Sequence, residues 1–251
     1  MAPCRDRYHA AERTADARNS SCRAADQNAR LRSPMSDRYV AGAARLNFHG
    51  VPDGPAPENF GPGPALLTTN PPDDRPTELR VIDGKLTNES TVDGRAAGYY
   101  TSASLGAPIT VIGARWAFTP RGGTSGALAL LVSQHRLRPG FPVHLVITPE
   151  VWTFGIWPPD RAAPDGLQTL QWQHFPVPLK QDGEHIYETQ VELRGQRAII
   201  DLPDGRQQII RDRRIADWAG PFATFEISLE HGLTDSRVGF TEIWADSIRP
   251  R

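Results

Sequence analysis

Residues 187–210 read YETQVELRGQRAIIDLPDGRQQII, and this stretch decides the fold class. Polar and apolar residues alternate from Tyr187 to Leu193, which is the period of a strand with one buried face. Gly195 separates this run from a second apolar run, Ala198–Leu202. Asp204-Gly205 then leads into a third run, and an Asp-Gly pair favours the positive φ angles of a tight hairpin turn. The stretch therefore predicts three consecutive antiparallel strands.

The same pattern continues in both directions from this stretch. Apolar runs recur at the ~8–12-residue spacing of a β-sandwich, and 22 glycines and 23 prolines supply the chain reversals between them. A single helix is expected near 212–219, before Gly220-Pro221. We predict an all-β, antiparallel two-sheet sandwich, with strands near Leu79–Ile82, Lys85–Asn88, Gly98–Thr101, Ile109–Phe118, Ala127–Gln134, Val143–Thr148, Val151–Ile156, Gln168–Phe175, Tyr187–Leu193, Arg197–Leu202, Gln207–Arg211, Phe222–Ser228 and Val238–Ala245.

Composition divides the chain into three parts. Residues 1–35 form an arginine-rich stretch that has almost no large aliphatic residues and is expected to be disordered. Met35 is a second candidate start of the protein, and the other interpretation of this stretch is a basic arm that contacts an acidic partner. Residues 36–77 are rich in proline and glycine and are expected to form an extended lead-in, with a short strand near Asn47. The sandwich is expected over 78–251.

Charge and hydropathy exclude several classes of partner. The formal net charge is −1, so no overall field favours nucleic acid or an anionic membrane. No apolar stretch reaches the ~20 residues of a membrane span, and no apolar segment near the N-terminus predicts a secretory signal peptide. The localisation and the oligomeric state stay open.

Residues 78–246 resemble the concanavalin A-like lectin and glucanase superfamily, including its laminin-G-like modules. The resemblance rests on the order strand, glycine, strand and Asp-Gly over 187–205 and on the closing run Ser236–Asp246. The stretch from Leu202 to Pro221 also resembles jelly-roll modules on tail and surface proteins of actinobacterial phages. The resemblance implies an antiparallel jelly-roll sandwich, and among its known activities are carbohydrate binding and glycan cleavage.

Two glutamates are the candidate catalytic pair. Alternation places Glu188, Gln190 and Glu192 on one face of a strand. Retaining glucanases of the resembled superfamily carry two carboxylates on one strand with an acid between them, and the reaction needs them about 5–5.5 Å apart. Gln190 stands at the middle position here, so the pattern departs from that of the glucanases. A half-exposed strand with alternating polar residues explains the run more simply.

Aromatic side chains are the candidate ligand contacts. Trp157 precedes two prolines where a strand enters a loop, which favours an exposed ring that can stack on a sugar. Trp172 is expected to share a face with Leu170 and His174, while Gln171 and Gln173 lie on the other face and can bond hydroxyl groups. The alternative is a core position, which alternation with aliphatic residues favours for four tryptophans: Trp116, Trp152, Trp172 and Trp244.

No metal centre is predicted. The histidines are scattered without the spacing of a zinc site. Loop carboxylates leave a weak case for calcium, but a role in turns explains them better: Asp160, Asp165, Asp182 and Asp235.

The function expected from the sequence is a non-catalytic, lectin-like module. It would bind carbohydrate, or a surface protein, through Trp157, Trp172, His174, Gln171, Gln173 and Gln190. Two alternatives stay open. One is a glycoside hydrolase or polysaccharide lyase that uses Glu188 and Glu192, and the other is a structural module of a cell surface or a virion.

Overall fold

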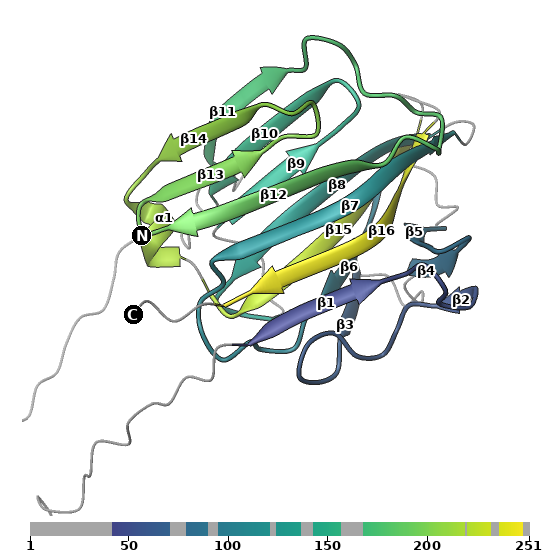
Figure 1. The fold of residues 1–251 in the computed structure, drawn as a ribbon, viewed down its shortest axis with the longest axis horizontal. Helices are drawn as coiled ribbons and strands as arrows, with labels where there is room; N and C mark the ends of the chain where they lie inside the picture. The colour runs from purple at the N-terminus through teal and green to yellow at the C-terminus, as the bar shows by residue number, and fades with distance from the viewer. Residues whose placement is uncertain are drawn as a thin grey trace, which may run out of the picture. The chain divides into compact units, whose positions relative to one another are not determined.

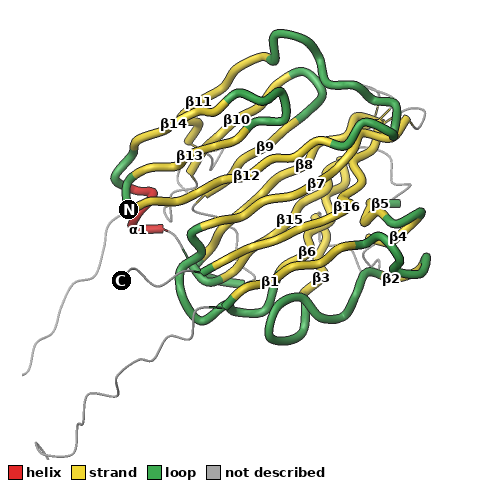
Figure 2. Tube along the Cα trace, in the orientation of Figure 1, coloured by secondary structure: helices red, strands yellow, loops and turns green. Residues whose placement is uncertain are grey.

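The computed structural model describes residues 42–70, 79–89, 95–120, 124–136, 143–156, 168–218, 220–231 and 236–247. All of these residues belong to one compact unit, Tyr39–Arg251. Strands dominate, and they form two layers that face each other (Figures 1 and 2). Every strand pair in both layers is antiparallel. The predicted two-sheet jelly-roll sandwich is confirmed.

The first layer is a nine-stranded sheet. Its strand order is β14-β13-β12-β7-β16-β5-β4-β2, and β1 pairs with β16 beside β5. The strands are β1 (Ala43–Asn47), β2 (Gly54–Pro55), β4 (Leu79–Ile82), β5 (Lys85–Asn88), β7 (Val111–Pro120), β12 (Tyr187–Arg194), β13 (Arg197–Asp201), β14 (Gln207–Arg211) and β16 (Ser236–Asp246).

The second layer is a seven-stranded sheet with the order β11-β10-β9-β8-β15-β6-β3. The strands are β3 (Leu66–Asn70), β6 (Arg95–Thr101), β8 (Thr124–Ser133), β9 (Val143–Ile147), β10 (Val151–Ile156), β11 (Gln168–His174) and β15 (Phe222–His231). Consecutive strands β8 to β11 pair in sequence, whereas β15 crosses over to pair with β8 and β6. Segments far apart in the chain therefore meet in the middle of this sheet.

The core lies between the two sheets because alternate residues of each strand point inward. On β12, Tyr187, Thr189, Val191 and Leu193 are buried, as the alternation predicts. The layers meet directly through aromatic rings: Phe225 of β15 and Phe240 of β16 lie 5.8 Å apart, edge to face. Such pairs add specific geometry to the hydrophobic burial that holds a sandwich together.

Tight turns connect the short hairpins. Asp83 and Gly84 join β4 to β5, and both have positive φ angles of 49° and 68°. Two consecutive positive φ angles are the mark of a type I′ turn, whose twist matches that of paired strands. Asp83 is also the one non-glycine residue with positive φ among the described residues. The two strands predicted on either side of this Asp-Gly pair are therefore joined as a hairpin.

The single helix among the described residues is α1 (Arg214–Trp218), shorter than the predicted 212–219. The reason is that Asp212 caps it: its Oδ1 accepts a hydrogen bond from the backbone N–H of Arg214 at 2.9 Å. A capping side chain stands outside the helix that it caps. No described helix is long and apolar enough to cross a membrane.

The proline- and glycine-rich stretch contributes more to the sheets than an extended lead-in. It contains β1, β2 and β3, which extend both layers. β1 pairs with β16 over Ala43–Asn47, upstream of the expected short strand. The prolines stand between or at the ends of these strands, where a missing N–H costs no ladder hydrogen bond. The predicted disordered stretch, residues 1–35, lies outside the described residues.

Candidate functional site

Trp172 is more exposed than Trp116, Trp152 and Trp244. Its exposed fraction is 54%, and the neighbouring His174 is also exposed. The two rings lie edge to face with their centroids 4.7 Å apart. Both residues stand on β11, the last strand of the seven-stranded sheet, and Trp172 pairs with Thr153 of β10. A large ring held open to solvent by a strand is a suitable platform for a flat apolar ligand face.

The structure separates this ring pair from three residues near it in sequence. Gln171 and Gln173 pair with Phe154 and Trp152, whose side chains are fully buried, so the two glutamines belong to the inner face of the strand. A β-bulge shifts the register next to Phe154, and Leu170 packs against the core. The expectation that Leu170 shares a face with Trp172 is therefore wrong, because the extra residue reverses the alternation.

A single row of side chains runs from Trp172 across the outer face of the seven-stranded sheet. Cross-strand pairing places its members side by side in the order Trp172, Thr153, Val146, Ala129, Glu226 and Tyr99. Three small or β-branched side chains thus lie between the tryptophan at one end and Glu226 and Tyr99 at the other. Four strand steps of about 4.8 Å separate Trp172 from Glu226, a span of about 19 Å.

Polar groups gather at the middle of the same face. Oε2 of Glu226 lies 3.8 Å from Nε2 of His144, and both side chains are largely buried. The Ser228 hydroxyl donates a short hydrogen bond to Oε1 of Glu226. Glu226 and His144 stand on the two strands that flank β8, where Glu226 pairs with Ala129 and His144 pairs with Leu131. The Glu226 carboxylate is thus held by a hydroxyl and an imidazole of the same sheet.

The candidate catalytic glutamates stand on the other layer. Glu188 and Glu192 lie on the outer face of β12, in the middle of the nine-stranded sheet. Glu188 accepts a hydrogen bond from Arg115 Nε at 2.8 Å, and Glu192 accepts two from Arg194, from Nε at 2.5 Å and from Nη2 at 2.9 Å. Because Arg194 lies farther along β12 than Glu192, that ion pair draws Glu192 away from Glu188. Each carboxylate is thus engaged with its own arginine.

Gln190 has a packing partner on that same outer face. Its Oε1 accepts a hydrogen bond from Trp244 Nε1 at 3.2 Å, and the indole ring covers Gly113 of β7. The guanidinium of Arg45 lies 5.5 Å from the centre of the same ring. Trp244 is only 8% exposed, so Gln190 holds a largely buried ring in place on this face.

The other tryptophans divide as follows. Trp116 and Trp152 are fully buried, as predicted, and Trp244 is largely buried. The core interpretation of Trp172 is wrong, because its side chain is 54% exposed on β11, the last strand of the seven-stranded sheet. Trp157, the expected exposed ring, lies outside the described residues.

The loop aspartates that the structure describes shape turns. Oδ1 of Asp182 accepts hydrogen bonds from the backbone N–H groups of Glu184 and His185 at 3.0 and 2.8 Å. These bonds, that of His185 first, hold the pKa of Asp182 below its usual value. Within the described ranges no group of three or more His, Cys, Asp or Glu side chains could hold a metal ion. The other expected loop acids, Asp160, Asp165 and Asp235, lie outside those ranges.

Sequence reasoning missed the pair of Glu226 and His144. Each lies in a strand that the sequence predicted, and Glu226 interrupts an apolar run between Phe225 and Ile227. A charged residue in such a run was the available signal. Their approach depends on the crossover that sets β15 next to β8, which no local pattern contains.

Comparison with known proteins gives a fold rather than a family. No family model matches the chain, and no curated protein matches its sequence. Among solved structures, the CBM2 module of an evolved Dit protein from Lactobacillus casei BL23 phage J-1 is 12% identical, with a TM-score of 0.52 over 84% of this chain and 99% of that one. The potassium-bound carbohydrate recognition domain of Emp46p is 11% identical, with a TM-score of 0.52 over 74% of this chain and 89% of that one.

An enzyme shares the same fold. A non-specific endo-β-1,3(4)-glucanase of family GH16 is 10% identical, with a TM-score of 0.52 over 82% of this chain and 90% of that one. Lectin-like, glucanase and phage modules are therefore alike in backbone and different in role, and at these identities the likeness shows the fold alone. The chain has the concanavalin A-like jelly-roll fold.

Proposed function

We propose that this protein is a non-catalytic module that binds an extended carbohydrate across the outer face of the seven-stranded sheet. The observation that carries the proposal is the exposure of Trp172. Burial of apolar surface contributes about 25 cal/mol of free energy per Å². A sugar ring that stacks on the exposed indole would gain this free energy by covering it. His174, edge-on beside it, supports the ring and adds a polar edge to the same platform.

The row from Trp172 to Tyr99 gives the ligand a direction. The part of the row from Trp172 to Glu226 spans about 19 Å, which suits several linked sugar rings rather than one. Thr153 beside Trp172 and Glu226 farther along are polar members of this row, and the side chains of Val146 and Ala129 between them are short. A carboxylate at the Glu226 end favours neutral or amino sugars over acidic ones, because two like charges repel in a partly desolvated site.

The outer face of the nine-stranded sheet supports catalysis poorly. A nucleophile and an acid must converge on one bond, whereas Glu188 and Glu192 are each held by a separate arginine. The Gln190 amide between them is engaged with Trp244. The contacts favour binding over hydrolysis by this pair.

Binding to a panel of soluble and insoluble neutral polysaccharides tests the proposal. We expect Trp172→Ala to weaken binding at least tenfold, which corresponds to about 1.4 kcal/mol, and Trp172→Phe to retain most of it. Glu188→Gln provides the control on the opposite sheet and should bind as the parent does. Absence of binding to every glycan would refute the proposal, and so would a loss that follows Glu188→Gln but not Trp172→Ala.

A further inference from the structure

Strand β14 is an open end of the nine-stranded sheet. It pairs with β13 on one side, and no described strand pairs with the other. The opposite end of the sheet is β2, which is only two residues long and includes Pro55. Short length and proline are common means of protecting a sheet edge from further pairing. β14 has five residues, no proline and no register shift against β13.

The backbone of β14 directs three N–H groups and three carbonyls toward this open side. Hydrogen bonds join Leu202 N–H to the Arg206 carbonyl and Asp212 N–H to the Gln196 carbonyl, at the two ends of the β13–β14 ladder. Bonded and non-bonded pairs alternate along an antiparallel ladder. Residues 207, 209 and 211 therefore fall on the non-bonded positions and point their backbone groups away from β13.

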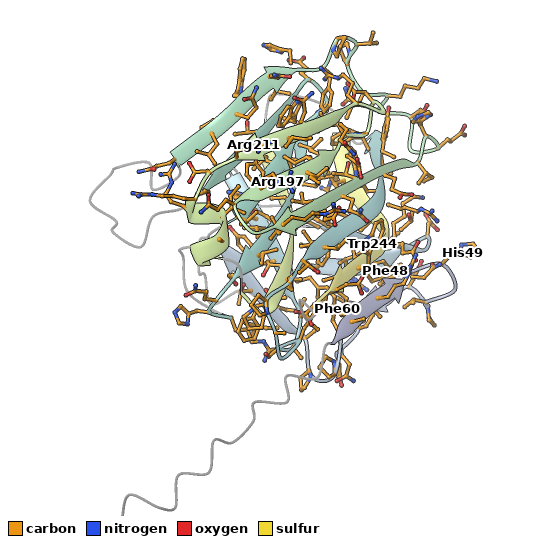
Figure 3. All side chains as sticks on the ribbon, turned by 60° about the vertical axis from the view of Figure 1, so that its left-hand side comes forward. Phe48, His49, Phe60, Arg197, Arg211 and Trp244 are labelled. Atoms are coloured by element: carbon orange, nitrogen blue, oxygen red, sulfur yellow. The ribbon has the colours of Figure 1, made fainter. Side chains whose placement is uncertain are left out.

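Two side-chain pairs on the outer face of β14 are unfavourable for a strand that faces solvent. Ile209 is 54% exposed and stands opposite Ile199, so an apolar pair faces water. Arg211 stands directly opposite Arg197, and like charges in this position destabilise a sheet (Figure 3). Pairs of this kind lower the stability of the isolated protein, and they are expected where a surface binds another molecule.

We propose that β14 pairs antiparallel with β14 of a second copy of this chain, centred on Ile209. In this register Ile209 lies opposite Ile209 of the second copy, and Arg211 lies opposite Gln207 of the second copy. All three outward-pointing residues of each strand then meet their counterparts as bonded pairs, giving six backbone hydrogen bonds. A two-fold axis makes the contact closed, so the assembly stops at a dimer.

The polar side chains are oriented for this contact. Gln207 donates its Nε2 to Asp201 Oδ1 at 2.8 Å, which leaves its Oε1 as an acceptor toward the open edge. In the dimer, Arg211 of the second copy donates to that oxygen. The positive charge of one copy thereby approaches the Asp201 carboxylate of the other, and both isoleucines leave water together.

The interface is small, which sets the conditions of the test. One strand pair buries less than the ~1,200 Å² of a standard stable interface, so we expect association in the micromolar range. Sedimentation velocity over a wide range of protein concentrations should show a reversible shift from monomer to dimer.

Two isoleucine variants test the location of the contact. Ile209→Lys should remain monomeric at every concentration, while its far-UV circular dichroism matches that of the parent. Ile186→Lys is the matched control, because Ile186 is 47% exposed but lies outside β14, and it should dimerise as the parent does. A parent that stays monomeric, or an Ile209→Lys variant that still dimerises, would overturn the proposal.

A charge exchange tests the register. In a dimer of the Arg211→Glu variant, the new carboxylate would lie against Gln207 and Asp201 of the second copy. In a dimer of the Gln207→Arg variant, the new guanidinium would lie against that of Arg211 of the second copy. Each variant alone should therefore be monomeric. Mixed together, the two variants place opposite charges at one end of the strand pair and restore a heterodimer. Failure of the mixture to associate, when the parent does, would show that the strands do not pair in this register.

Discussion

Replacement of Gly113 by alanine should loosen the centre of the nine-stranded sheet. A Cβ atom at this position would come within 2.4 Å of Cε2 and Cζ2 of Trp244, and within 2.7 Å of its Nε1. Real side chains do not approach so closely, so the indole must move. The ring is large, and its Nε1 is fixed to Gln190, which limits how far it can shift without losing that bond.

The cost follows from the contacts that the indole loses. Overpacking of this kind costs about 1–3 kcal/mol, and the broken hydrogen bond to Gln190 adds about 1 kcal/mol. The lower backbone entropy of alanine in the unfolded chain returns about 0.5–1 kcal/mol. We therefore expect Gly113→Ala to lower the free energy of unfolding by about 2 kcal/mol.

A double-mutant cycle in urea isolates the contact. Trp244→Ala should by itself cost about 3 kcal/mol, because it removes a largely buried ring. In that background Gly113→Ala should be neutral or slightly stabilising, since nothing then covers the new methyl group. If Gly113→Ala costs as much with alanine at position 244 as with tryptophan, or costs nothing in the parent, the steric argument fails.

Three further changes probe other contacts. Hydrogen bonding to Arg214 lowers the pKa of Asp212 to about 2, so Asp212→Asn should cost about 1 kcal/mol in urea melts above about pH 4, and the difference should vanish as the pH falls through about 2, where the carboxyl is protonated in both states. Glu242→Gln should lower stability by about 1 kcal/mol and reduce its salt dependence, because this carboxylate binds two arginines. Burial raises the pKa of Tyr100, whose hydroxyl donates to the Pro57 carbonyl at 2.8 Å, so its absorbance should titrate last on alkaline titration, and Tyr100→Phe should cost about 1 kcal/mol.

Most of the strands could be predicted because each is encoded by its own residues. β12 shows the reason: its buried face is already visible as the alternation of Tyr187, Thr189, Val191 and Leu193. The hairpin at Asp83-Gly84 could be predicted because the turn itself selects residues that tolerate positive φ. Strands β1 to β3 were mostly missed because prolines hide the alternation in a stretch where pairing partners, not the local pattern, make the strands.

The candidate site could be predicted only in part. Trp172 and His174 follow from alternation on one strand, but their exposure depends on β11 being the last strand of its sheet. The same alternation misplaced Leu170, because one bulged residue reverses the faces beyond it. Glu188 and Glu192 were correctly placed on one face, but the arginines that hold them apart could not be foreseen from that run alone.

The sequence by itself determined the class of fold, the hairpins and the inward face of the predicted strands, because these depend on side-chain periodicity and turn chemistry over a few residues. The tertiary structure alone decided which strands are neighbours beyond these hairpins. That choice brings Glu226 toward His144 and lays Trp244 over Gly113. It also leaves β14 with an open edge. The physical reason is that strand order is set by packing two whole sheets around one core. The free energy of that packing depends on contacts between distant segments, so no single segment encodes it.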